Sequence, residues 1–443
     1  MIILPFIYYV CISTIFYIIS RLFYNSKNPL LDIAFIFVIG GFPIKCVFSL
    51  PYFGGVMSGA FLNEVNIHAG LIFSILFLLI RKRRTMKISK QFALFILFFV
   101  ISFFNPLNIN SSAIFPVLFH LCEIFIFIFI VKECFSQDEI FSSLFSSLIT
   151  LVLINTFLTI CYPIFHMNKF LSLFYGDVSL EGSMRREGYD SAVGIYTHPS
   201  GLANVSSMCA IFFFANLILN RKHVNINSFF LFLSLFCLFF TYARTGYFLC
   251  IVCLCVTYAF VKRLRFRLKY VLIFFGLTIC FYFSILYIPI LNELFFSSNS
   301  EDMADARLAH WLLGFEIWEK SPLLGVGLNT HVFFMQKYFS VSALSDSFLF
   351  TNPIHNVHLQ ILAETGIVGL CFWLVWYCYS IKLCVKKVKM TSNISLLGYS
   401  IFASLLIYSF LYNFTGWSFC QYQTFCPFLI LSYVLLPQKK VST

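Results

Sequence analysis

Apolar stretches about as long as a bilayer is thick recur along the whole chain of 443 residues. A helix crosses the hydrocarbon with roughly 20 residues, and aromatic-rich segments somewhat shorter than that still qualify. The content of 60% apolar residues, including 60 Phe, suits lipid and would expose far too much apolar surface in water. We therefore expect an all-α polytopic integral membrane protein, one transmembrane domain over 1–443, and exclude the ordinary soluble classes. The thirteen expected spans are about 2–20, 30–50, 66–80, 91–104, 113–131, 140–164, 201–220, 226–242, 246–261, 270–291, 356–380, 394–412 and 419–436.

The basic residues follow the alternation of these spans. If the cluster between Arg81 and Lys90 is cytoplasmic, 22 of the 30 Lys and Arg residues fall on the cytoplasmic side, as the positive-inside rule requires. The membrane topology therefore accounts for the net charge of +12, and we expect no nucleic-acid partner. The alternation predicts two long loops on the outer side of the membrane, at 165–200 and 292–355. A twelve-span arrangement with both chain ends inside is the alternative, and it keeps both loops outside. The eight basic residues that fall outside are Lys45, Lys169, Arg185, Arg186, Arg244, Arg307, Lys320 and Lys337.

The second of these loops is expected to contain an amphipathic helix over about 303–319, with Ser300 as its cap. Its apolar residues, Trp311 among them, recur at three and four, as in a helix that lies at the bilayer surface. By pattern alone this helix is an interfacial strut, with Arg307 binding lipid phosphate. The segment 321–327 follows, where Pro322, Gly325 and Gly327 break the helix and allow close backbone approach, so a binding turn is one interpretation.

His355 precedes the eleventh span directly, at its outer end. The positive end of a helix dipole disfavours a second positive charge, which favours the neutral, proton-accepting imidazole. In a continuous helix Gly366 lies about 20° and Gly369 about 40° from the azimuth of His355, so that stripe predicts close helix packing beneath the histidine, with Glu364 on the opposite face. The alternative role for His355 is an interfacial capping residue. His358 is nearby, but no third ligand stands at a recognisable spacing, so we expect no metal.

Several further charged residues need a partner. Arg244 stands between two apolar spans on the outer side, where a guanidinium that binds phosphate oxygens is a functional hypothesis. Arg185 and Arg186 share that side but lie in a polar loop, where a solvated role is the alternative. Within the spans, Lys45 and the pair His120 and Glu123 are interpreted either as a proton path or as satisfied interhelical hydrogen bonds.

A set of spaced motifs carries a family resemblance. His355 and Asn356 are followed after nine residues by Gly366 and after two more by Gly369. This pattern resembles the signature of bacterial O-antigen ligases and the related O-antigen polymerases. The segment 242–246 is similar to the family's serine–arginine step, with Ala243 in place of the serine. The upstream residues that resemble the family's arginine–tryptophan helix and its Gly-Val-Gly turn are Arg307, Trp311, Pro322, Gly325 and Gly327.

The resemblance, which covers about 195–380, implies a GT-C-like membrane glycosyltransferase of the bacterial inner membrane with its active site facing the periplasm. It implies Arg244, Arg307 and His355 as the functional trio. It also implies an undecaprenyl-diphosphate-linked oligosaccharide as donor and no metal or other cofactor. If the protein is a polymerase, a second such oligosaccharide is the acceptor, and the further partners that we expect are membrane lipids and a chain-length regulator. The residues expected to contact substrate are Arg185, Arg186, Trp311, Gly325, Gly327 and Asn356.

Three functions remain open at this point. A polymerase extends glycan on the lipid carrier, a ligase moves finished glycan to the lipopolysaccharide core, and both share the motif. The extreme Phe and Ile content favours the polymerase by association, because it is typical of the products of surface-polysaccharide gene clusters. The third function, a lipid-linked oligosaccharide flippase or other transporter, needs charged residues along a route through the bundle, and the expected spans carry few.

Overall fold

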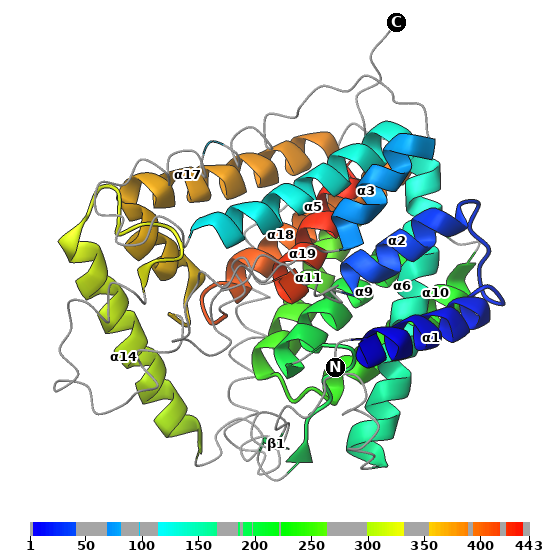
Figure 1. The fold of residues 1–443 in the computed structure, drawn as a ribbon, viewed down its shortest axis with the longest axis horizontal. Helices are drawn as coiled ribbons and strands as arrows, with labels where there is room; N and C mark the ends of the chain where they lie inside the picture. Colours follow the sequence, from blue (N-terminus) through cyan, green and yellow to red (C-terminus); the bar gives the residue numbers. More distant parts are fainter. Residues whose placement is uncertain are drawn as a thin grey trace, which may run out of the picture.

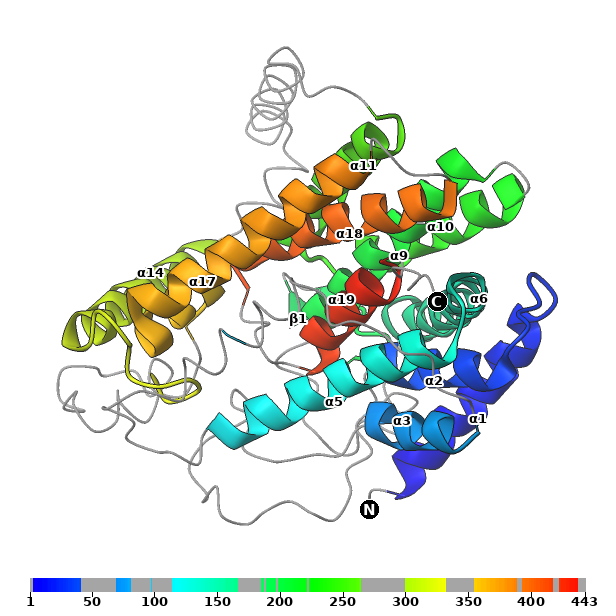
Figure 2. The same cartoon turned by 90° about the horizontal axis from the view of Figure 1, so that it is seen from above.

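The computed structural model describes residues 3–40, 69–80, 97, 114–165, 185–186, 189–196, 198–220, 223–263, 299–331, 354–388, 393–416 and 422–436. Within these ranges the chain is helical apart from its connections and one antiparallel pair of two-residue strands, β1 (Arg185–Arg186) and β2 (Tyr189–Asp190). Figures 1 and 2 show the arrangement of the helices from two perpendicular directions. The helices are α1 (Ile3–Ser20), α2 (Pro29–Ile39), α3 (Ala69–Ile80), α5 (Ile114–Cys134), α6 (Gln137–Thr159) continued by the π-helical turn η2 (Ile160–Ile164), α9 (Pro199–Leu219), α10 (Val224–Phe239), α11 (Arg244–Val261), α14 (Asn299–Lys320), α17 (Val357–Val388), α18 (Asn393–Tyr412) and α19 (Tyr422–Val434).

Eleven of the thirteen expected spans coincide with described helices. The expected span 270–291 lies outside the described residues, as does 91–104 apart from position 97. Five helices of the described part are long and apolar enough to cross a membrane, and four shorter ones are also apolar. The protein is therefore an all-α polytopic membrane protein, as the sequence predicts. The five long segments are Gln137–Tyr162, Pro199–Leu219, Arg244–Val261, Val357–Val388 and Ser395–Tyr412.

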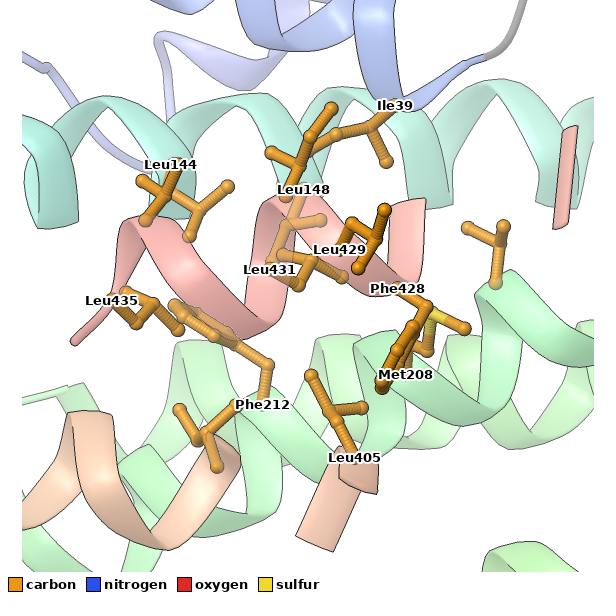
Figure 3. Close-up of a cluster of buried hydrophobic side chains, with 14 of the residues drawn as sticks. Ile39, Leu144, Leu148, Met208, Phe212, Leu405, Phe428, Leu429, Leu431 and Leu435 are labelled. Carbon is orange, nitrogen blue, oxygen red and sulfur yellow. The ribbon is translucent and has the colours of Figure 1, made fainter. Parts of the chain in front are cut away.

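The core lies where α2, α6, α9, α18 and α19 meet (Figure 3). Because lipid is as apolar as the side chains, helices in a bilayer are held together by close packing and by hydrogen bonds between them rather than by the hydrophobic effect. Two such hydrogen bonds lie in the core: Tyr408 donates to Asn204 Oδ1 at 2.8 Å, and Thr257 donates to Ser404 Oγ at 2.8 Å. They join α18 to α9 and to α11. The core residues labelled in Figure 3 are Ile39, Leu144, Leu148, Met208, Phe212, Leu405, Phe428, Leu429, Leu431 and Leu435.

One end of the bundle gathers connections that the charge alternation predicts to be cytoplasmic. Tyr24, in the connection between α1 and α2, hydrogen-bonds Ser142 of α6 at 3.1 Å, and its ring lies 5.9 Å from the ring of His223. Gln137, at the start of α6, donates to the carbonyl of Leu435 at 2.9 Å. In Figure 1 the loop that follows α1 marks this end at the right.

Connections predicted to be periplasmic meet at the opposite end. The Ala192 N–H donates to Phe240 O at 2.7 Å, and the Val357 N–H donates to Asn413 O at 2.8 Å. The grouping of the connections thus agrees with the predicted alternation. Their assignment to the periplasm stays a prediction.

Candidate active site

The start of α17 is fixed by its cap. The side chain of Asn356 accepts a hydrogen bond from the Leu359 N–H at 3.1 Å, which is the N-cap arrangement, and His355 is the residue just before it. The Val357 N–H, which has no partner within the helix, donates to Asn413 O instead. The prediction that His355 stands at a helix start is therefore confirmed, and Asn356 contributes the cap.

Helix α14 packs against His355 through two neighbouring residues, His310 and Trp311. The indole N–H of Trp311 donates to the carbonyl oxygen of His355 in a long hydrogen bond of 3.4 Å. The ring of His310 meets the ring of His355 edge to face, with centroids 5.7 Å apart and planes at 72°. Figures 1 and 2 both show α14 beside the beginning of α17. The amphipathic helix expected here exists, but Ser300 does not cap it, because the helix already begins at Asn299.

Helix α17 is broken at Gly366, which has φ 65° and ψ −170°. The segment 321–327 fills the break. The carbonyls of Ala363 and Glu364 accept hydrogen bonds from the N–H groups of Val326 and Gly327, at 3.0 and 2.8 Å. Every backbone polar group in a bilayer needs such a partner, so this segment acts as a backbone splint for the kink.

The splint also accepts hydrogen bonds, because N–H groups of α17 beyond the kink donate to its carbonyl oxygens. Ile367 donates to Pro322 O at 2.9 Å, and Val368 donates to Leu323 O at 3.2 Å. The two segments are close enough that a Cβ on Gly325 would lie 2.3 Å from the Glu364 carbonyl carbon, and one on Gly366 would lie 2.2 Å from Leu323 O. Gly325 also has a positive φ of 70°.

These contacts change two of the expectations. The prediction that Gly366 and Gly369 form a stripe beneath His355 on one helix face is wrong. The helix is not continuous at Gly366, so the angular positions of residues before and after the kink cannot be compared. Close approach does occur at Gly366, and it is made by the splint. Gly325 and Gly327 have a folding role in that splint, and their contact with substrate stays a prediction.

A buried acid–imidazole pair lies beneath the splint. His331 Nδ1 is 2.5 Å from Glu364 Oε1, both side chains are fully buried, and Gln360 donates to the same oxygen at 3.5 Å. The sequence reasoning missed His331. The only available signal was Glu364, since an acidic residue inside an apolar span needs a nearby partner.

His358 anchors the first turn of α17 to α18. Its Nδ1 accepts from the indole N–H of Trp373 at 3.2 Å, and its Nε2 donates to Phe410 O at 3.0 Å. Both ring nitrogens thus have protein partners, which identifies His358 as a structural residue. His120 Nδ1 and Glu123 Oε2 lie 3.6 Å apart, both buried on α5, whereas Lys45 lies outside the described residues.

The predicted arginines lie in three different elements. Arg244 is the first residue of α11 and is half-buried. Arg307 lies on α14, four residues before Trp311. Arg185 and Arg186 form β1, in register with Asp190 and Tyr189. The structure thus brings the helix of Arg307 against the start of α17, whereas Arg244 begins a separate helix.

Residues 229–374 match the model of a protein family described as O-antigen ligase. This segment, about a third of the chain, is similar to that family. The match includes most of the predicted site residues, from Arg244 to Asn356, and it leaves out Arg185 and Arg186. A comparison with curated proteins gives no match.

The matched segment contains α14, the splint, and α17 as far as Leu374, which are the elements that fix His355. The resemblance predicted from the motif is confirmed, and it indicates a multi-pass inner-membrane protein of the glycosyltransferase kind that acts on lipid-linked glycan. The family does not distinguish polymerase from ligase.

Proposed function

We propose that the protein is an O-antigen polymerase. It transfers glycan from undecaprenyl diphosphate to a sugar hydroxyl of another lipid-linked repeat unit on the periplasmic side of the inner membrane, without a metal. His355 is the general base, and Arg244 and Arg307 bind the diphosphate. The membrane carries the lipid ends of both substrates, and a chain-length regulator is the expected protein partner.

The observation that supports this function best is the setting of His355. Its backbone is held by Trp311 from α14, and the two residues that follow it are held by the cap and by Asn413. Its side chain is only half-buried. A base must be positioned and also reachable by its substrate, and this residue meets both requirements.

The reaction needs few groups. The acceptor hydroxyl oxygen attacks the anomeric carbon of the donor, and the bond from that carbon to the diphosphate oxygen breaks. The diphosphate leaves with the electron pair, and the hydroxyl proton passes to His355. Guanidinium groups stabilise the charge that develops on the leaving group, and contacts with lipid and glycan hold the reactants together.

The choice of polymerase over ligase rests on composition, namely the 60 Phe in the chain, and this is support by association. The matched family, which is described as O-antigen ligase, does not separate the two functions. A flippase is less well supported, because one of the few acidic residues in the spans, Glu364, is already paired with His331.

The test uses purified protein in lipid with a synthetic undecaprenyl-diphosphate repeat unit, alone or with lipopolysaccharide core. A polymerase produces a ladder of lengths from the repeat unit alone. A ligase produces only core-linked glycan, and a flippase produces neither. His355→Asn keeps a small polar side chain but no base, and we expect it to lose at least about 100-fold in rate. Near wild-type rate in this variant contradicts the assignment of His355.

The arginines are tested by Arg244→Lys and Arg307→Lys, which keep the charge and lose the planar fork that binds two phosphate oxygens. We expect the rate to fall by about tenfold or more in each. Arg263→Lys is the matched control, since Arg263 lies just beyond the opposite end of α11. Equal rates in all three variants would contradict diphosphate binding by Arg244 and Arg307 and would favour contact with membrane lipid as their role.

A further inference from the structure

His310 is a fully buried imidazole on α14 in ring contact with His355. It lies outside the motifs that carry the family resemblance, since those name Arg307 and Trp311 on this helix. Burying a polar ring costs free energy that an apolar side chain of similar size would not. A histidine at a buried position beside the candidate base therefore needs a reason.

The fold brings this residue to His355 by a close helix contact. Gly314 lies one turn after His310, and a Cβ there would come within 2.9 Å of Leu359 Cγ and 3.1 Å of Ile354 Cδ1. The absence of a side chain at this position lets α14 approach both sides of the start of α17. Trp311 then bonds the backbone of His355 while His310 meets its ring.

The two contacts restrict different parts of His355. The hydrogen bond from Trp311 fixes the peptide group and does not act on the imidazole ring. An edge-to-face neighbour limits that rotation, because this is the arrangement that aromatic rings prefer. A general base depends on the direction of its nitrogen as much as on its distance from the proton.

We propose that His310 is a positioning residue that sets the ring plane of His355, so that its proton-accepting nitrogen faces the acceptor hydroxyl. This inference rests on the proposed function. It assigns His310 no contact with substrate and no share of the transferred proton.

The test compares His310→Leu with His310→Phe. Leucine keeps an apolar side chain of similar size in a buried helical position, so the variant is expected to fold, but it has no ring. We expect kcat to fall roughly 10- to 100-fold with KM within about twofold of wild type, which is the range for loss of a supporting contact. Phenylalanine restores a ring, so His310→Phe should recover at least about a third of the decrease in log kcat that His310→Leu causes.

Ile317→Ala is the matched control, because Ile317 is a fully buried residue of the same helix that packs in the α14–α17 core. It should lower stability and leave the kcat of the folded protein near wild type. A merely structural role for His310 predicts that His310→Leu also keeps kcat, or that Ile317→Ala loses as much, and either result overturns the proposal. Equal rates for His310→Leu and His310→Phe overturn it as well.

A second background separates this proposal from the proposed function. In His355→Asn protein, adding His310→Leu should cause no further loss of the residual rate, because a residue that acts through His355 has nothing left to position. If wild-type protein makes neither polymer nor core-linked glycan, the proposed function has failed. If it makes product and His310→Leu does so equally fast, only the role of His310 has failed.

Discussion

Replacing Gly366 by alanine tests the central feature of the site, the kink in α17 and its backbone splint. Gly366 has φ 65° and ψ −170°, a combination that glycine alone adopts readily. A Cβ there would also lie 2.2 Å from Leu323 O and 2.5 Å from Leu324 N. These are backbone atoms, so the splint itself has to move.

The expected destabilisation has two parts. Holding alanine in this conformation costs about 1–3 kcal/mol. Movement of the splint weakens the hydrogen bonds from Ile367 to Pro322 O and from Val368 to Leu323 O, and a buried polar group left without its partner costs about 1–3 kcal/mol. Gly366→Ala should therefore lower the free energy of unfolding by about 2–6 kcal/mol.

Gly70→Ala is the matched control. Gly70 is the second residue of helix α3, and a Cβ there would stand at an ordinary contact distance of 3.6 Å from Phe127 Cβ. Its stability should stay within about 1 kcal/mol of wild type, since alanine is the better helix former. Unfolding is followed by detergent titration with tryptophan fluorescence and far-UV circular dichroism. Equal unfolding midpoints for Gly366→Ala and Gly70→Ala would refute the splint.

Two further predictions concern the start of α17. Asn356→Ala removes the N-cap and should destabilise the protein by about 1 kcal/mol in the same titration, whereas Asn356→Asp keeps the cap and should stay near wild type; equal loss in both would show that the cap is unimportant. Trp311→Phe removes the hydrogen bond to His355 O and should lower the rate of glycan transfer, whereas Trp318→Phe removes an equivalent bond to Pro322 O and should leave that rate unchanged; a rate that falls equally in both variants would contradict a specific role for Trp311.

The sequence by itself determined the membrane class, most of the helices and the alternation of their connections. The length of an apolar segment and the basic charge of a loop are local properties of the sequence. In a bilayer the first decides whether the segment spans the membrane, and the second decides on which side the loop lies. The start of α17 at His355 could be predicted for the same reason, because an N-cap is formed by neighbours in sequence, here Asn356 and Leu359.

The tertiary structure alone decided how the site is built. Azimuths around α17 have meaning only if the helix is continuous through Gly366. Glycine at that position is compatible with a helix and with a kink, and the approach of the segment 321–327 decides between them. The pairing of His331 with Glu364 joins residues that are 33 positions apart.

The contact between His310 and His355 joins residues that are even further apart in sequence. No local periodicity encodes such contacts, since they depend on which surfaces of two helices meet. Here the meeting surfaces depend on Gly314 and Gly366, because the absence of a side chain at each position lets its backbone come close to another segment.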